Sequence, residues 1–224
     1  ARFAQGRQMH IPLLAGWVQD EGYPFDALGL PHRNAAEFRD AGQALFGKDR
    51  LADFLRLYPA VNDEQANASA RALTGDLVIA EQTWHWLELQ RRTGMPVFGY
   101  KFTYTSPYSP IAAHITDVPF VFGSLTPQFI LGSRTPSSGV DRAFSDQVIA
   151  YWVNFAFHGN PNGPGVTGWP VYDATGTIQE LGKAIGPRSN DQAARFRFIS
   201  SFRKHGLFPA NWGKAVTREQ RGKP

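Results

Sequence analysis

Two apolar segments, 11–18 and 97–104, restrict the fold of this chain more than any other part of its sequence. The first reads Ile-Pro-Leu-Leu-Ala-Gly-Trp-Val and carries no charged or hydrogen-bonding side chain before its tryptophan. Such a run is typical of a strand that helices cover on both faces of a parallel sheet. The second segment places four aromatic rings on one face at a period of two, which predicts another strand: Phe98, Tyr100, Phe102 and Tyr104.

Helical patterns separate and follow these strands. Asn34 and Glu37 predict a helix start of the capping-box type, and Gly47 predicts its end. The other elements that we expect are a helix from about Asp49 to Pro59, the longest helix from 74–76 to Gly94, a helix over 141–157, a short strand over 177–181, and a last helix from a cap at Asp191 to Gly206. This alternation predicts an α/β fold with a mainly parallel sheet and flanking helices.

Composition limits the domain count and the classes of partner. A chain of 224 residues with 42% hydrophobic residues can build one core, so we interpret residues 1–224 as one domain or a part of one. Several of its cations lie in segment 207–224, which we interpret as a flexible tail. The net charge is only +4, and neither an aromatic platform nor a groove-reading motif accompanies the tail, so a nucleic-acid partner is not expected.

Other functional classes can be set aside on residue types. The chain has no cysteine, which excludes disulfides, thiol catalysis and cysteine-based zinc sites. No histidine pair has the spacing of a metal site such as His-Glu-x-x-His, so we expect neither a metal nor another cofactor. No apolar run approaches the roughly 18 residues of a membrane helix, so we expect no membrane span. The cellular compartment stays open.

An acid and a histidine stand out as candidates for catalysis. Glu21, in Asp20-Glu21-Gly22, follows the first strand, and His114 follows the second after a loop. The carboxyl ends of parallel strands are where α/β sheets gather their sites. An acid in a glycine-flanked loop is usually only solvated, however, and Asp20 and Asp117 are competing carboxylates beside the two candidates.

Two parts of a serine-hydrolase site are missing from these 224 residues. The nucleophile elbow Gly-x-Ser-x-Gly occurs nowhere, and no Gly-Gly-rich oxyanion segment is present. The chain therefore reads as the C-terminal half of an enzyme, and we expect it to be inactive alone.

Several segments carry a family resemblance, and they occur in this order: 13–16 before 20–22, Ala113-His114 before 120–123, 151–156 before 159–162, and then 169–173. Over roughly 11–202 the chain resembles the type-B carboxylesterases, which include cholinesterases and bacterial para-nitrobenzyl esterases. The resemblance implies an α/β-hydrolase fold and hydrolysis of carboxylic esters. It further implies Glu21 as the triad acid, His114 as the general base, and Tyr23 and Phe25 as residues that line the substrate gorge. For these two aromatic residues, ordinary core packing is the alternative.

The resemblance also implies a partner. The serine and the oxyanion hole of such an enzyme lie in the N-terminal half, so that half is the expected partner, together with a small-molecule ester. The alternative is a cholinesterase-like protein that has lost catalysis and serves as a binding or adhesion module. A module of that kind would have no need to keep both Glu21 and His114.

Overall fold

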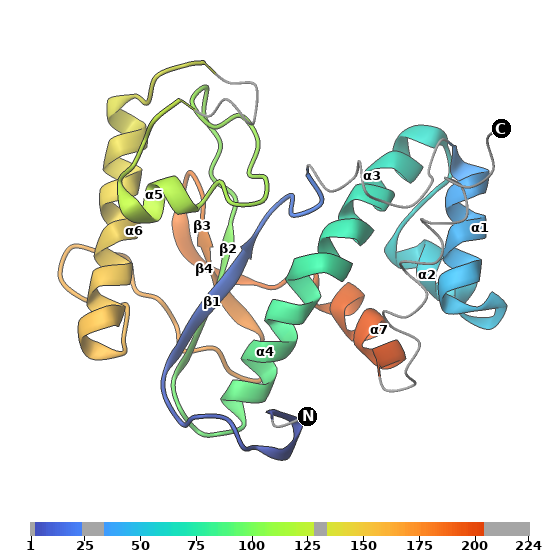
Figure 1. Cartoon of the computed structure of the whole chain (residues 1–224), viewed down its shortest axis with the longest axis horizontal. Helices are drawn as coiled ribbons and strands as arrows, with labels where there is room; N and C mark the ends of the chain where they lie inside the picture. The colour runs from blue at the N-terminus through green and yellow to red at the C-terminus, as the bar shows by residue number, and fades with distance from the viewer. Residues whose placement is uncertain (1–2, 24–33, 128–133, 204–224) are drawn as a thin grey trace, which may run out of the picture. The chain divides into compact units, whose positions relative to one another are not determined.

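The structure is a computed structural model that describes residues 3–23, 34–127 and 134–203 (Figure 1). Phe25 and the tail segment 207–224 lie outside the described residues. The chain divides into two compact units. The first, which we call the sheet unit, contains residues 1–20 and 82–191, and the second, the helical unit, contains residues 21–81 and 192–224.

The sheet unit is built on four strands in the order β1-β2-β3-β4. Their bounds are Leu13–Val18 for β1, Val97–Phe102 for β2, Thr177–Leu181 for β3 and Ile185–Ser189 for β4. β1 pairs with β2 in parallel from Leu13↔Val97 to Val18↔Phe102, β2 and β3 are also parallel, and β4 is antiparallel. The mainly parallel α/β sheet is thus confirmed.

Strand β4 was not expected from the sequence. Its residues are Ile-Gly-Pro-Arg-Ser and are half-buried or exposed, so they lack the apolar pattern of the other strands. Pro187 has no amide to donate, which suits an edge strand that pairs on one side.

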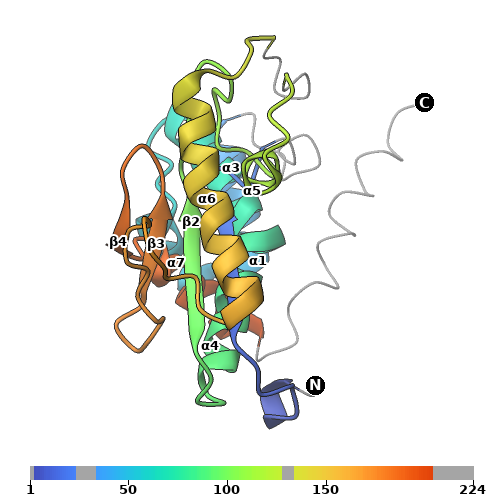
Figure 2. The ribbon, with the colours of Figure 1, turned by 90° about the vertical axis from the view of Figure 1, so that its left-hand side faces the viewer.

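Helices cover both faces of this sheet. On one face, aromatic rings of β2 pack against α6 (Gly139–His158): Phe98 on Phe155, Tyr100 on Trp152, and Phe102 on Phe144, with centroids 5.3–6.1 Å apart. Figure 2 shows α6 lying along this face. The short helix α5 (Val118–Phe122) packs beside α6. The period-two interpretation of β2 is therefore confirmed, although the strand ends at Phe102 rather than Tyr104.

The opposite face of the sheet carries α4 (Glu81–Arg91). A methyl group at Gly99 of β2 would lie 3.0 Å from Leu87 of α4 and equally close to Ile178 of β3, so glycine allows the helix to approach. At the amino end of β1, a single turn of 3-10 helix, η1 (Phe3–Gln5), precedes the strand. The sheet unit is a three-layer α/β/α arrangement.

The asparagine-proline-asparagine turn has a structural role in the sheet unit. The Asn162 side chain accepts from the Trp169 amide at 2.6 Å and donates to the Trp169 carbonyl at 2.9 Å. The Trp169 indole in turn donates to the Gly99 carbonyl at 3.1 Å. These hydrogen bonds fix the segment that leads into β3, so two of the family-like motifs stabilise the scaffold.

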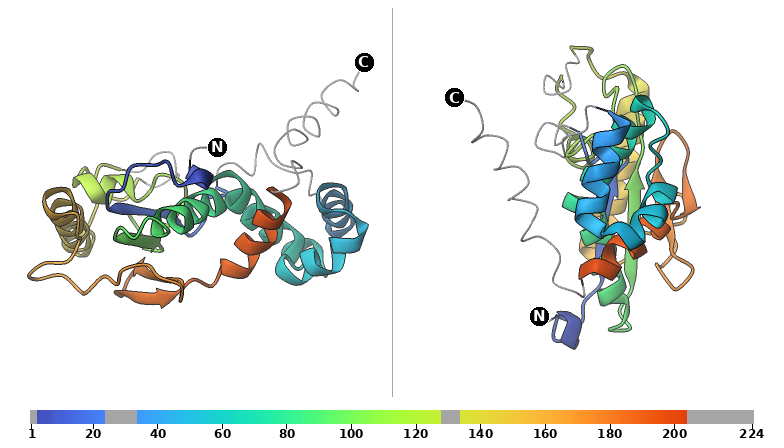
Figure 3. Two further views of the ribbon diagram at one scale, coloured as in Figure 1. Left: turned by 90° about the horizontal axis from the view of Figure 1, so that it is seen from below. Right: turned by 90° about the vertical axis from the view of Figure 1, so that its right-hand side faces the viewer.

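The helical unit has an aromatic core. Its elements are α1 (Ala35–Phe46), η3 (Lys48–Arg50), α2 (Leu51–Leu57), α3 (Asp63–Gly75), the π-helical turn η4 (Asp76–Ala80) and α7 (Ala193–Arg203). Asn34 caps α1 by accepting the Glu37 amide at 2.9 Å, and Gly47 ends it with φ 87°, as predicted. Phe46 lies 5.0–5.1 Å from the rings of Phe54, Phe198 and Phe202. Figure 3 shows α7 beside α2.

Two helix starts differ from the expected ones. The long helical stretch begins at Asp63 rather than 74–76, because Asn62 accepts the Gln65 amide at 2.9 Å and caps α3. The buried face of α3 consists of small residues apart from Leu73, so it gave little apolar signal. The last helix begins at Ala193, and the Asp191 carboxylate accepts from Lys101 at 2.9 Å instead of capping it.

Candidate active site

A backbone bridge joins the loops that follow β1 and β2. The Asp20 amide donates to the Ala112 carbonyl at 2.9 Å, and Asp20 pairs with Ala113 in a parallel bridge. Glu21 follows Asp20 directly and His114 follows Ala113 directly. The two residues predicted from the sequence are therefore each attached to one member of the same bridge.

The Glu21 loop packs on helix α3 within the helical unit. Glu21 is only 5% exposed. A methyl group on Gly22 would overlap the Arg71 carbonyl of α3, and one on Gly75 would lie 2.6 Å from the Gly22 amide nitrogen. Glycines at both positions let the backbone of the acid-bearing loop touch the helix. Burial of the carboxyl group also means that its electrostatic interactions are weakly screened.

His114 lies half-buried in a tight turn of the sheet unit. Thr116, which is buried, donates both its amide (3.0 Å) and its hydroxyl (2.7 Å) to the Ala113 carbonyl. Between them, Ile115 has a φ of 68°, and it is the one non-glycine residue with positive φ in the described part of the chain. A β-branched residue in this region is strained, and such strain persists only where the surroundings hold it.

Asp117 is the carboxylate closest in sequence to His114, and its environment is unusual. It accepts from the Tyr100 hydroxyl at 2.8 Å, which ties the turn to β2. Burial raises the pKa of the Asp117 carboxyl, while the Tyr100 hydrogen bond and the charge of His114 oppose that rise. The structure thus brings Asp117 into the electrostatic field of His114 but uses one of its oxygens to anchor the turn.

Of the other candidate residues, the structure describes Tyr23 and Asp20. Tyr23 lies half-buried with the Arg71 guanidinium 5.9 Å from its ring centroid. Phe25 lies outside the described residues. Asp20 is half-buried, and its backbone forms the bridge to Ala113.

Ile115, Thr116 and Tyr100 shape this site but were not singled out from the sequence. A left-handed backbone at an isoleucine has no sequence signal, because residue type favours the opposite conformation. Tyr100 was interpreted only as a core residue of the strand. The glycine after Glu21 was the one available signal for the close approach to α3.

The strain at Ile115 predicts that glycine at this position gives a more stable protein than alanine, the reverse of the usual order. Ile115→Gly should have a free energy of unfolding about 1 kcal/mol higher than that of Ile115→Ala, since glycine adopts positive φ without a Cβ clash. Urea denaturation of the two variants measures this difference. Ile115 is 50% exposed, so both variants lose similar contacts. At Val118, a 46% exposed helical position, alanine should be the more stable substitution. Equal glycine-alanine differences at the two positions would contradict the strain at 115.

Within the described part of the chain, no three or more histidine or acidic side chains are grouped as metal ligands would be. None of the described helices combines the length and apolarity needed to cross a membrane.

Comparisons with known proteins agree on one family. The sequence model of the "Carboxylesterase family" matches residues 2–198. The chain is 31% identical over 192 residues to the fumonisin B1 esterase of Sphingopyxis macrogoltabida, covering 82% of this chain and 34% of that protein. It is 28% identical over 172 residues to the para-nitrobenzyl esterase of Bacillus subtilis (75% and 33% covered). With pig liver carboxylesterase, identity is 30% over 159 residues (68% and 25% covered). The chain thus matches between a quarter and a third of the length of these relatives.

Proposed function

The chain belongs to the carboxylesterase family, and from this premise we propose that it supplies the acid and the general base of a serine esterase. Its sheet with flanking helices has the α/β-hydrolase architecture of that family. Esterases among the relatives support hydrolysis of carboxylic esters at the level of the family. The observation that most supports the assignment of roles is the Asp20–Ala113 bridge, which joins the loops directly before Glu21 and His114.

In the proposed mechanism, His114 is the proton carrier. A serine hydroxyl is a poor nucleophile at neutral pH, so a neutral imidazole takes its proton during attack on the ester carbonyl. The imidazolium then returns that proton to the departing alcohol. In the second half of the reaction, His114 takes a proton from water, which attacks the acyl-enzyme. The proton then returns to the serine oxygen as the carboxylic acid leaves.

Glu21 acts on His114 and not on the substrate. Its carboxylate accepts the second ring N–H, which selects the reactive tautomer and stabilises the imidazolium, and Glu21 stays ionised. The close packing of Gly22 on α3, at Arg71 and Gly75, supports this positioning role, because it limits movement of the Glu21 backbone.

The nucleophile and the oxyanion hole belong, in this proposal, to a segment that is not part of these 224 residues. The chain matches about a third or less of the length of the relatives, and we expect the missing segment to be their N-terminal half. Tyr23 and Phe25 would line the ester-binding site, and an apolar lining suits uncharged acyl or aryl esters.

This division of the site gives a direct test. The chain alone should neither turn over a p-nitrophenyl ester nor react with a fluorophosphonate, because no serine in it sits in an elbow motif. Intact-mass analysis after labelling measures this, and a protein that also contains the N-terminal half serves as the positive control. Stoichiometric labelling of a serine within the chain alone would overturn the proposed division.

A further inference from the structure

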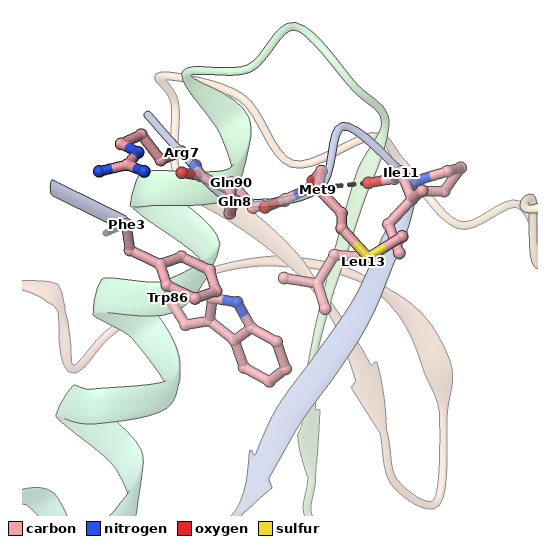
Figure 4. Close-up of a pocket in the computed structure, with 9 residues that line it drawn as sticks. Phe3, Arg7, Gln8, Met9, Ile11, Leu13, Trp86 and Gln90 are labelled. Atoms are coloured by element: carbon pink, nitrogen blue, oxygen red, sulfur yellow. Dashed lines mark hydrogen bonds between the residues drawn. The ribbon is translucent and has the colours of Figure 1, made fainter. Parts of the chain in front are cut away.

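A cavity lies in the sheet unit at the amino end of β1 (Figure 4). This cavity, which we call the N-terminal slot, has a volume of about 340 Å³, within the size range of small-molecule sites. Its lining includes Phe3, Arg7, Met9, Ile11, Leu13 and Trp86. The Asp20–Ala113 bridge lies past the other end of β1, roughly 20 Å along the strand at about 3.3 Å per residue. The slot is therefore separate from that bridge.

Hydrogen bonds hold the walls of the slot in place. Gln90 of α4 donates to the carbonyls of Met9 (3.0 Å) and Ile11 (2.8 Å), and Gln8 donates to the carbonyl of Leu89 (3.1 Å). These bonds fasten the segment before β1 to the last turns of α4. Because the side-chain NH2 groups of Gln8 and Gln90 are engaged in these bonds, the surface that remains for a ligand is mainly hydrocarbon and aromatic.

The slot exposes an unusual amount of apolar surface. Phe3 and Trp86 meet edge to face with centroids 6.4 Å apart, and they remain 40% and 44% exposed. Met9 is 73% exposed and Ile11 is 49% exposed. Figure 4 shows the two rings facing Met9 and Leu13 across the hollow. Contiguous exposed apolar side chains of this kind mark binding sites.

Arg7 selects the kind of ligand. It is the only charged side chain among the residues that line the slot, and none of the described carboxylates is paired with it. An apolar cavity with one cation at its margin complements a molecule with an apolar body and one anionic end.

We propose that the N-terminal slot binds a medium-chain carboxylate. The alkyl chain lies between the Phe3 and Trp86 rings and the side chains of Met9 and Leu13, and the carboxylate meets the Arg7 guanidinium. This inference is independent of the proposed catalytic function, because binding needs neither a nucleophile nor turnover.

The test is calorimetric titration of the chain with octanoate and, separately, with 1-octanol, both below aggregation. We expect saturable binding at one site, with octanoate bound more tightly. Arg7→Gln should weaken octanoate binding about fivefold, as for one exposed ion pair, and leave 1-octanol unchanged. Arg92→Gln is the matched control, since Arg92 is also exposed but does not line the slot.

Trp86→Ala should weaken both ligands at least about tenfold, because it removes an aromatic wall. Phe3→Ala, outside the longer helices, provides the same test if the tryptophan variant does not fold. Absence of saturable octanoate binding, equal loss with Arg92→Gln, or unchanged binding to the wall variants would overturn the proposal. A dimer that Trp86→Ala dissociates would likewise overturn it in favour of an interface between copies.

Discussion

Replacing His114 by alanine should lower kcat by about 10⁴-fold or more in a full-length protein that contains this chain, since the general base is lost. The residual rate would come from the oxyanion hole and substrate binding. KM should change little, because the imidazole contributes chiefly as the proton moves. Steady-state hydrolysis of a p-nitrophenyl ester measures both constants.

The control for this substitution is His158→Ala. His158 is exposed at the end of α6, and the loss of its ring should leave kcat within about twofold of the parent because surface substitutions are usually mild. Near-native kcat in the His114 variant would move the base role to another histidine. A parent protein without any turnover would favour the non-catalytic binding module instead.

Glu21→Gln should lower kcat by roughly two to four orders of magnitude, by analogy with other triad acids. The substitution keeps the size of the side chain but removes the anion that stabilises the imidazolium. It also permits the amide to donate to His114, which favours the wrong tautomer. KM should again change much less than kcat.

The neighbouring carboxylates supply the matched controls for Glu21. Asp20→Asn and Asp117→Asn should both stay within about tenfold of the parent kcat if those residues only order their loops. All variants are compared at equal folded fraction, checked by thermal unfolding. If Asp117→Asn or Asp20→Asn loses the two to four orders of magnitude in kcat while Glu21→Gln keeps the kcat of the parent, the assignment of the acid is wrong.

Asp117 needs a separate stability check. Burial raises the pKa of Asp117 in the folded chain above its value in the unfolded chain. As the pH rises from the unfolded to the folded pKa, ionisation of this carboxyl therefore lowers the stability of the fold. Asp117→Asn removes this cost above that pKa, and the Asn carbonyl can still accept from Tyr100. A loss of activity in this variant would therefore not arise from electrostatic destabilisation of the turn.

The sequence predicted the elements whose local signals agree with their burial. β1 and β2 had apolar or alternating patterns that match their packing between helices, and α1 had a cap at each end. α3 was missed because a buried face made mostly of small residues carries little hydrophobic contrast, and Thr74 and Gly75 inside the helical stretch looked like a helix start. β4 was missed because its pairing with β3, and not its own residues, makes it a strand.

The site was predictable only in part for a related reason. Glu21 and His114 lie in recognisable motifs, and the order of those motifs along the sequence indicated the family. The positive φ of Ile115 goes against its residue type, and the hydrogen bond from Tyr100 to Asp117 joins residues 17 positions apart in the sequence. Neither the motif around His114 nor the strand pattern around Tyr100 indicates this hydrogen bond, so local reasoning did not find that anchor.

The Asp20–Ala113 bridge makes the length of the short connection after β1 more critical than its composition. Only Gln19 separates the end of β1 from Asp20. Inserting or deleting one residue there would put a different residue into the bridge and, because side chains alternate along an extended backbone, would turn the next one to the opposite side. Variation in this stretch is thus constrained to substitutions, while the longer loop before Ala113 can absorb a change in length farther from the bridge.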